Sequence, residues 1–228
     1  MRPLPKRNIR SSVTILAQVI AAVALLLVSC SVSPGYSASQ VGAHAIIIGV
    51  GAGARAFDRL AKADPRPSRR GELNGGIELG YFLTPSLRVS LMGRLGGTFF
   101  DFDGAFGSGN ASEQSWGGRG GLDWVQETQG PLSPYLGLGY DYGEARSWIR
   151  SPLQDDEGPR NIFSGVSTRA GVNLHLSPRL RLNWEILAGG YYAHTFDERL
   201  QTRYRWLGYS LGTSIGISCV LLRGAVAQ

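Results

Sequence analysis

The sequence is poor in cysteine and lysine, and after residue 40 no stretch has a convincing helical period. Of the two cysteines, only Cys219 lies outside the N-terminal segment, so a mature chain that has lost Cys30 could form no internal disulfide. Lys6 and Lys62 are the only lysines among 23 basic residues. These shortages argue against a disulfide-linked scaffold and against a helical domain.

Residues 1–39 have the features of a secretory signal peptide. Basic residues precede an apolar run over 13–28, which at about 16 residues is short for a membrane-spanning helix. Small residues at 37–39 predict cleavage before Gln40, although an uncleaved anchor remains an alternative. A second alternative is a lipobox ending at Cys30, which would place a lipid on that cysteine. Cleavage at Gln40 removes four positive charges and lowers the net charge of +6 to about +2. We therefore expect no nucleic-acid partner.

A tight turn at Leu83-Thr84-Pro85-Ser86-Leu87 separates two runs in which apolar and polar side chains alternate. Period 2 on both sides of a short turn predicts an antiparallel hairpin. Similar turns recur at 130–134 and 176–180. The chain after the signal therefore reads as a series of hairpins with one turn type.

Counting the alternating runs predicts eight strands of about ten residues or more. The expected strands cover about 43–57, 73–83, 87–99, 118–127, 136–142, 164–176, 181–192 and 207–221. Polar segments at 58–72, 101–116, 143–161 and 195–203 are expected to be long loops. Alternating long and short connections predict an all-β fold: an eight-stranded antiparallel transmembrane up-and-down barrel over residues 40–222, with short periplasmic turns and four longer extracellular loops. Residues 223–228 would be a short C-terminal tail.

The apolar face carries no charged residue through the middle of any strand, which favours a lipid-facing exterior. Aromatic residues gather at both ends of the strands, as two membrane interfaces require. We expect Tyr81, Phe82, Trp124 and Tyr135 in the short-turn girdle, and Phe99, Tyr140, Tyr142, Tyr192, Tyr204 and Trp206 in the other. A soluble lipocalin-like barrel is the alternative. The glycines of 49–54 resemble a dinucleotide-binding motif, but no βαβ unit surrounds them.

In hairpin architecture and in turns such as 83–87, residues 41–222 resemble the small eight-stranded outer-membrane barrels, the OmpA-like and opacity-type group. This resemblance implies location in the bacterial outer membrane and insertion by the barrel assembly machinery. The sequence departs from the group because it ends on Ala227-Gln228, whereas such barrels usually end on an aromatic residue that the machinery reads. The resemblance identifies a fold group and not a function.

The inward face is predicted to carry equal numbers of acids and bases. They are Glu78, Arg94, Arg119, Asp123, Asp141, Arg169, Arg181 and Glu185. Simple hairpin registers place Glu78 diagonal to Arg94, Glu185 diagonal to Arg169, and Arg119 opposite Asp141, and charges at such offsets can reach one another. Because an unpaired buried charge is strongly destabilising, we expect ion pairs that plug the lumen. A narrow charge-lined pore is the alternative.

The sequence gives little support for an enzyme. Its three histidines, His44, His175 and His194, have no placed serine nucleophile, so a lipid A-modifying triad remains only an alternative. We expect no catalytic residue, cofactor or metal site, because the acids at 101–103 and 155–157 lack EF-hand spacing. Arg66, Arg69 and Arg70 could contact lipopolysaccharide phosphates or be ordinary loop charges.

The expected function is a structural or surface-interaction role, such as adhesion or membrane integrity. The alternatives are a narrow ion or small-solute channel and the lipid A enzyme. Expected partners are outer-membrane lipid and lipopolysaccharide, the assembly machinery, and a host or matrix ligand at the extracellular loops. We expect a monomer.

Overall fold

The computed structural model describes residues 42–59, 70–104, 107–128, 130–151, 154–197 and 201–222. The predicted signal peptide with Cys30, the tail 223–228, and Arg66 and Arg69 of the first polar segment lie outside these residues. Within the described ranges, no helix is long and apolar enough to cross a membrane.

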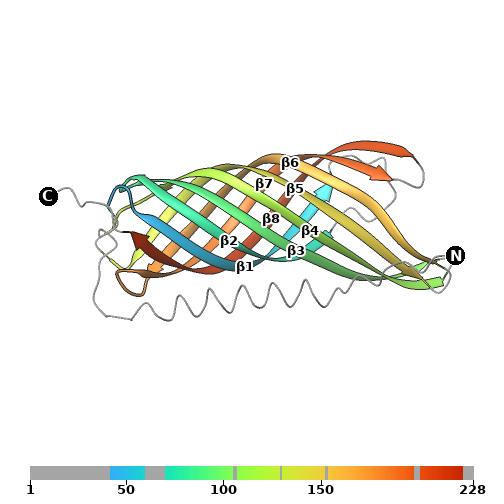
Figure 1. Ribbon diagram of the computed structural model, residues 1–228, viewed down its shortest axis with the longest axis horizontal. Coiled ribbons are helices and arrows are strands. Elements are labelled where there is room, and N and C mark those ends of the chain that lie inside the picture. Colours follow the sequence, from blue (N-terminus) through green and yellow to red (C-terminus); the bar gives the residue numbers. More distant parts are fainter. Residues whose placement is uncertain are drawn as a thin grey trace.

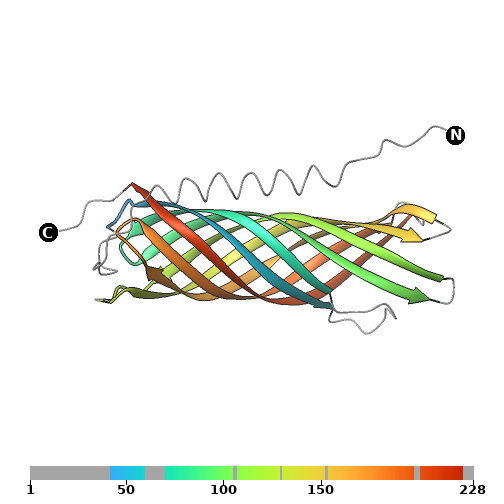
Figure 2. The same ribbon diagram turned by 90° about the horizontal axis from the view of Figure 1, so that it is seen from below.

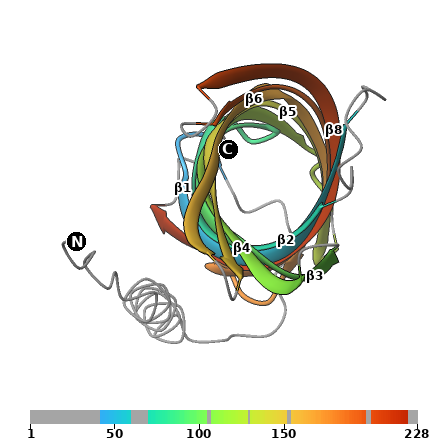
Figure 3. The same cartoon turned by 90° about the vertical axis from the view of Figure 1, so that its right-hand side faces the viewer.

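Eight antiparallel strands follow one another in sequence order and close into a barrel, as predicted (Figure 1). They are β1 (Ile46–Arg59), β2 (Arg70–Thr84), β3 (Leu87–Gly104), β4 (Gly107–Val125), β5 (Leu132–Ser151), β6 (Gln154–His175), β7 (Leu180–Asp197) and β8 (Thr202–Leu222). β1 pairs with β8, so that the view along the barrel axis shows an unbroken ring of strands (Figure 3). Closure leaves no free strand edge, which a hydrocarbon environment does not tolerate.

The strand register climbs steadily around the barrel. Paired residues lead from Ile48 on β1 through all eight strands to Tyr209 on β8, whose β1 partner is Asp58, ten residues beyond the start. A stagger of this size tilts eight strands by about 40° to the axis. The tilt is visible in the side view (Figure 2). Each successive strand in a row of paired residues therefore lies further toward the end opposite the short turns.

Strands continue through most of the polar segments that we expected to be loops. β3 and β4 pair as far as Gly104 and Gly107, and β5 and β6 pair as far as Ser151 and Gln154. The loop expectation for 101–116 and 143–161 was therefore wrong. Where the side chains of these projecting strands are described, outward positions such as Gln114 and Arg146 are polar, so the apolar alternation that marks a strand is lost there.

The apolar face of the barrel is its outer face. Large hydrophobic side chains such as Leu91, Leu138 and Leu211 are 58–61% exposed, whereas charged side chains such as Arg169 and Asp123 are buried inside. A water-soluble barrel would have the reverse arrangement. Exposed Tyr81, Trp124 and Trp184 lie toward the short turns, and exposed Trp116, Tyr140, Tyr142, Tyr192 and Tyr209 lie toward the other end. These two girdles border an apolar belt of the kind that spans an outer membrane.

Three aromatic residues that we assigned to the girdles are not on the lipid face. Phe82 and Tyr135 are 1% and 5% exposed and point into the lumen. Trp206 contacts the ring of Tyr191, whose side chain is 7% exposed. All three are one residue out of phase with the outward positions, because successive side chains of a strand point to opposite faces. Nearness to a strand end is therefore not sufficient to assign a girdle residue.

Replacing Leu138 by Arg tests which face meets lipid. Leu138 lies mid-belt on β5 with 58% of its surface exposed. An outward Arg near the bilayer centre should lower the free energy of folding into lipid vesicles by roughly 2–4 kcal/mol. Denaturant titration in vesicles gives the measurement, with Gln114→Arg, beyond the girdle on β4, as the matched control. Equal stability of the two variants would contradict the assigned orientation.

Candidate functional site

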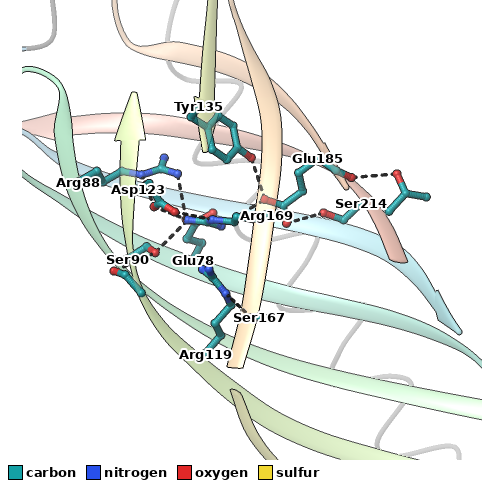
Figure 4. Close-up of polar contacts among 12 residues, drawn as sticks. Glu78, Arg88, Ser90, Arg119, Asp123, Tyr135, Ser167, Arg169, Glu185 and Ser214 are labelled. Carbon is teal, nitrogen blue, oxygen red and sulfur yellow. Dashed lines mark hydrogen bonds and ion pairs between the residues drawn. The ribbon is translucent and has the colours of Figure 1, made fainter. Parts of the chain in front are cut away.

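A guanidinium on β6 forms the centre of the charged lumen (Figure 4). Arg169 Nη2 lies 2.6 Å from Asp123 Oδ2 and 2.7 Å from Glu78 Oε1, and Arg169 Nη1 lies 3.2 Å from Glu185 Oε2. Its three acidic partners come from β4, β2 and β7, so that one side chain links strands on opposite sides of the barrel. The side chain of Arg169 has no measurable exposure to solvent.

Further polar groups complete the coordination of these acids. Arg88 Nε donates to Asp123 Oδ2 at 3.0 Å, and Arg88 Nη2 is 3.6 Å from Glu78. The Tyr135 hydroxyl donates to Glu185 at 2.8 Å, and the Ser214 hydroxyl donates to the other Glu185 oxygen at 2.9 Å. The desolvation cost of buried ions is offset only when their remaining hydrogen-bonding positions are filled, and this network fills most of them.

A second cluster lies further along the lumen around Asp141. Arg94 Nη2 is 2.8 Å from Asp141 Oδ1, and Arg55 Nη1 is 3.5 Å from the same oxygen. Ser167 donates to Asp141 and accepts a hydrogen bond of 3.1 Å from Arg119 Nε. The two clusters together fill the middle of the barrel with charged groups.

The structure brings together seven of the eight luminal residues that the sequence indicated, although some partners differ. The Arg169–Glu185 ion pair is present as expected. Arg94 binds Asp141 instead of Glu78. Arg119 lies opposite Asp141 in the register, as expected, but reaches it through the Ser167 hydroxyl. A two-dimensional register cannot show contacts across the lumen, and these decide the partners.

Arg181 does not fit the expectation that every luminal charge is paired. Its side chain is 2% exposed, its Nε and Nη2 atoms have no hydrogen-bond partner, and no carboxylate among the described side chains pairs with it. The guanidinium carbon instead lies 5.8 Å from the centre of the Phe82 ring. A cation over an aromatic face gains some electrostatic stabilisation without a counterion.

An apolar cluster closes the lumen at the end with the short turns. It consists of Ala45, Ile47, Phe82, Val125, Tyr135 and Val220, each at most 6% exposed.

Arg55 and Arg88 also belong to the charged clusters and were missing from the candidate residues. Strand alternation already placed Arg55, Arg88, Ile47 and Phe82 on the inward face. The sequence alternation could therefore have identified all four residues as luminal.

Glycines make room for the large luminal side chains. A Cβ added at Gly139 would lie 2.6 Å from the Arg119 guanidinium, and one added at Gly137 would collide with the Asp123 carboxylate. Both glycines are on β5, between Arg119 and Asp123 of the neighbouring strand β4 and Arg169 of the neighbouring strand β6. Part of the high glycine content therefore serves the packing of the charged clusters.

The histidines do not form a catalytic triad among the described residues. His44 Nδ1 is 2.6 Å from the Tyr81 hydroxyl, and the His194 ring lies edge-on to Tyr192. His175 Nε2 is 2.9 Å from the Ser133 hydroxyl, a serine–histidine pair. The charged neighbour of His175 is Arg181, however, and a cation cannot orient a histidine as the acid of a triad does. No group of three potential metal ligands occurs among the described residues.

No protein-family profile matches the sequence, and no curated protein matches it significantly. Solved structures do match. The outer membrane protein OprG from Pseudomonas aeruginosa has a TM-score of 0.54 at 15% identity, covering 80% of this chain and 98% of that protein. The chain has the fold of the small outer-membrane β-barrels. Together with the apolar belt and its girdles, this fold places the protein in the bacterial outer membrane.

Two further structures are similar at lower scores. Neisserial surface protein A has a TM-score of 0.46 at 18% identity, covering 76% of this chain and 96% of that protein. The outer membrane protein AlkL has a TM-score of 0.47 at 13% identity, covering 87% of this chain and 97% of that protein. At these identities a shared fold says nothing about ligand or reaction.

Replacing Arg169 by Gln should be strongly destabilising. The change leaves Glu185 without a cation and removes the bridge between Glu78 and Asp123. Breaking a buried ion pair by removing one partner costs about 3–5 kcal/mol. Urea titration in vesicles measures the loss, and Arg179→Gln at an exposed turn position is the control. The double variant Arg169→Gln/Glu185→Gln should recover part of the stability. An unchanged unfolding midpoint for Arg169→Gln would disprove a stabilising role.

Acidification should destabilise the end of the barrel with the short turns, through His175. This histidine is the last residue of β6 and lies beyond the apolar belt, on the side where Trp124 belongs to the girdle. Burial, followed by the nearby Arg181 guanidinium, lowers the pKa of His175 to about 4. Between about pH 6.5 and pH 4 the unfolded chain therefore binds a proton that the folded barrel does not, so stability falls as pH falls. Unfolding midpoints across this range should change less in His175→Gln than in wild type. Parallel profiles for the two proteins would refute the assignment.

Proposed function

We propose that the protein is a non-conducting outer-membrane barrel with a structural or surface-interaction role. The observation that carries this proposal is the filled lumen. The Arg169 and Asp141 clusters occupy its middle, and the apolar cluster of Ile47, Phe82 and Val220 occupies its short-turn end. Moving a hydrated ion through this interior would require breaking buried ion pairs and separating packed apolar side chains, both of which are costly.

The described residues favour a role at the barrel surface over one in its interior. No catalytic triad or metal cluster occurs among them, and the polar groups of the lumen are mostly engaged with one another. The strands of the β3–β4 and β5–β6 hairpins are 18–22 residues long, which is well beyond the 9–11 residues that cross a bilayer. Their projecting ends offer a surface for adhesion or for contacts with neighbouring molecules.

A narrow channel is the second candidate, and one observation favours it. A cavity of about 40 Å³ lies beside the charged clusters, lined in part by Arg94, Asn183 and Glu185. It has room for at least one water molecule, and its lining supplies polar partners. Water in the lumen is a minimum requirement for conduction, but it does not by itself make a continuous path.

Planar-bilayer recording in concentrated KCl distinguishes these two functions. We expect no steady current from the wild-type barrel. The double variant Ile47→Ala/Phe82→Ala thins the apolar cluster and should increase the frequency of conducting steps, whereas Leu79→Ala/Leu83→Ala on the outward face of β2 should not. A stable conductance in the wild type would support the channel and overturn the closed-lumen proposal.

The surface role needs a separate test in cells. Shortening the β3–β4 hairpin beyond Gly97 and Gln114, which pair with each other, removes the projecting strands and leaves the membrane belt intact. A deletion strain carrying this variant should show the same loss of adhesion or detergent resistance as the empty strain, while heat-modifiable gel mobility confirms that the barrel is folded. Full complementation by the shortened barrel would exclude this hairpin as the functional surface.

A further inference from the structure

Arg181 is a buried cation with one hydrogen-bonding edge that the protein does not satisfy. It is the second residue of β7, and 2% of its surface is exposed. Its Nε and Nη2 atoms are buried and have no hydrogen-bond partner among the described residues. These two nitrogens lie on the same edge of the guanidinium, and together they can hold an anion through two parallel N–H groups. An unsatisfied edge on a buried charge is costly and requires a physical explanation.

The carboxylates of the Arg169 cluster are committed to other cations. Glu78 and Asp123 are each in contact with both Arg169 and Arg88. Glu185 is held by Arg169 as well. No carboxylate among the described side chains forms an ion pair with the guanidinium on β7. The partner of that guanidinium is therefore not one of these acids.

The surroundings of Arg181 favour an anion over a water molecule. Arg88 on β3 is close enough to repel the Arg181 charge, and the Phe82 ring lies 5.8 Å from the guanidinium carbon. A ring attracts the cation through its face, but it does not replace the two acceptors that the N–H edge needs. A water molecule could accept those hydrogen bonds without offsetting the repulsion. An anion does both, and its attraction is strong in a poorly solvated interior.

Cys219 is the titratable neighbour of Arg181 on β8, and it interacts with the guanidinium electrostatically. Its buried thiol donates to the Val220 carbonyl oxygen at 3.8 Å. A sulfur that donates its proton is a neutral thiol and not a thiolate. The cysteine therefore does not serve as the counterion.

The strand next to Arg181 offers a further donor. Ser218 lies directly opposite Arg181 on β8 and is 8% exposed, so its hydroxyl is within reach of the guanidinium edge. Gly49, the β1 partner of Ser218, has no side chain, and a Cβ there would lie 3.1 Å from the Ser218 Cβ. The glycine keeps the space beside the hydroxyl open.

The position of Arg181 admits only a small ligand. The residue directly follows a turn in which the Leu176 and Ser177 amides donate to the Leu180 carbonyl at 2.9 and 3.1 Å. Within the lumen the apolar cluster, which includes Phe82, packs against the same guanidinium. A peptide, a sugar or a lipid headgroup would have to displace one of these elements. A single-atom anion needs much less room.

We propose that Arg181 binds a small monovalent anion of the halide class through Nε and Nη2, inside the short-turn end of the barrel. Chloride suits this site because a spherical ion of single charge costs less to bury than a multiply charged phosphate. The ion satisfies the guanidinium edge, balances its charge and links β7 to β8 through Ser218. The inference goes beyond the proposed surface role and requires only a folded barrel, so neither the conductance nor the adhesion experiment bears on it.

The chloride dependence of stability tests the site. Urea titrations in phosphatidylcholine vesicles at about pH 7.5, where histidine is largely neutral, would exchange chloride for gluconate at constant total salt. Gluconate is too large to enter the closed lumen. Because one ion binds the folded state, each tenfold rise in chloride above the dissociation constant should lower the unfolding equilibrium constant of wild type by up to about tenfold.

Three variants assign the dependence to Arg181. Arg181→Met should lose it, because methionine keeps an apolar contact with Phe82 and removes the N–H edge. Arg179→Gln removes a cation at an exposed position of the same turn and should keep it. Cys219→Ser should keep it as well. A chloride-independent wild type would mean that water satisfies the edge and would overturn the proposal, as would an unchanged dependence in Arg181→Met or its loss in Cys219→Ser. Heat-modifiable mobility ensures that each variant is folded.

Bromide diffraction on the wild type keeps the proposal testable if Arg181→Met does not fold. Crystals grown in bromide should give an anomalous peak within hydrogen-bonding distance of both Nε and Nη2 of Arg181. Peaks confined to exposed arginines such as Arg179 would mean an adventitious ion only, and the proposal would then be wrong.

Discussion

Hydrocarbon offers no hydrogen bonds, so every backbone amide and carbonyl in the membrane must be paired within the protein. Closure of β1 on β8 meets this requirement, and the rest of the structure depends on it. A closed ring of eight strands with a stagger of ten residues fixes the tilt, the diameter and the inward or outward direction of every side chain. With eight strands the interior is narrow enough for side chains to fill it. The charged lumen is thus a consequence of the closure.

Filling that interior with charged groups has a defined logic. Arg169 contacts acids from three different strands, so its position is determined by the whole ring and not by one hairpin. Hydroxyl groups of Tyr135, Ser214 and Ser90 supply the hydrogen bonds that the ion pairs leave unfilled. An apolar interior of the same volume could be as stable. The ion network instead ties strands from opposite sides of the barrel into one fixed arrangement.

The alternation of apolar and polar residues was sufficient to predict the fold. One face of each membrane strand meets lipid and the other faces the lumen, so apolar and polar side chains must alternate along the strand. The alternation gave the strand number and, together with the short turns, the pairing of Arg119 with Asp141. The aromatic residues at the strand ends and the unequal lengths of the connections indicated which face meets the membrane. The alternation failed to predict strands beyond the membrane, where the outward face no longer has to be apolar. The projecting parts of β4 and β6 read as loops because outward positions there, such as Gln114 and Arg160, are no longer apolar.

The sequence by itself therefore determined an eight-stranded barrel and the residues that enter its lumen. Only the tertiary structure decided which of them meet. Arg94 binds Asp141 and Arg169 binds Glu78 because curvature brings strands that are distant in the register across a narrow interior. Arg181 remained without an acid for the same reason: it lies at the level of the apolar cluster, where Phe82 is its neighbour. Partners in a closed barrel are set by depth and curvature, and a linear pattern contains neither.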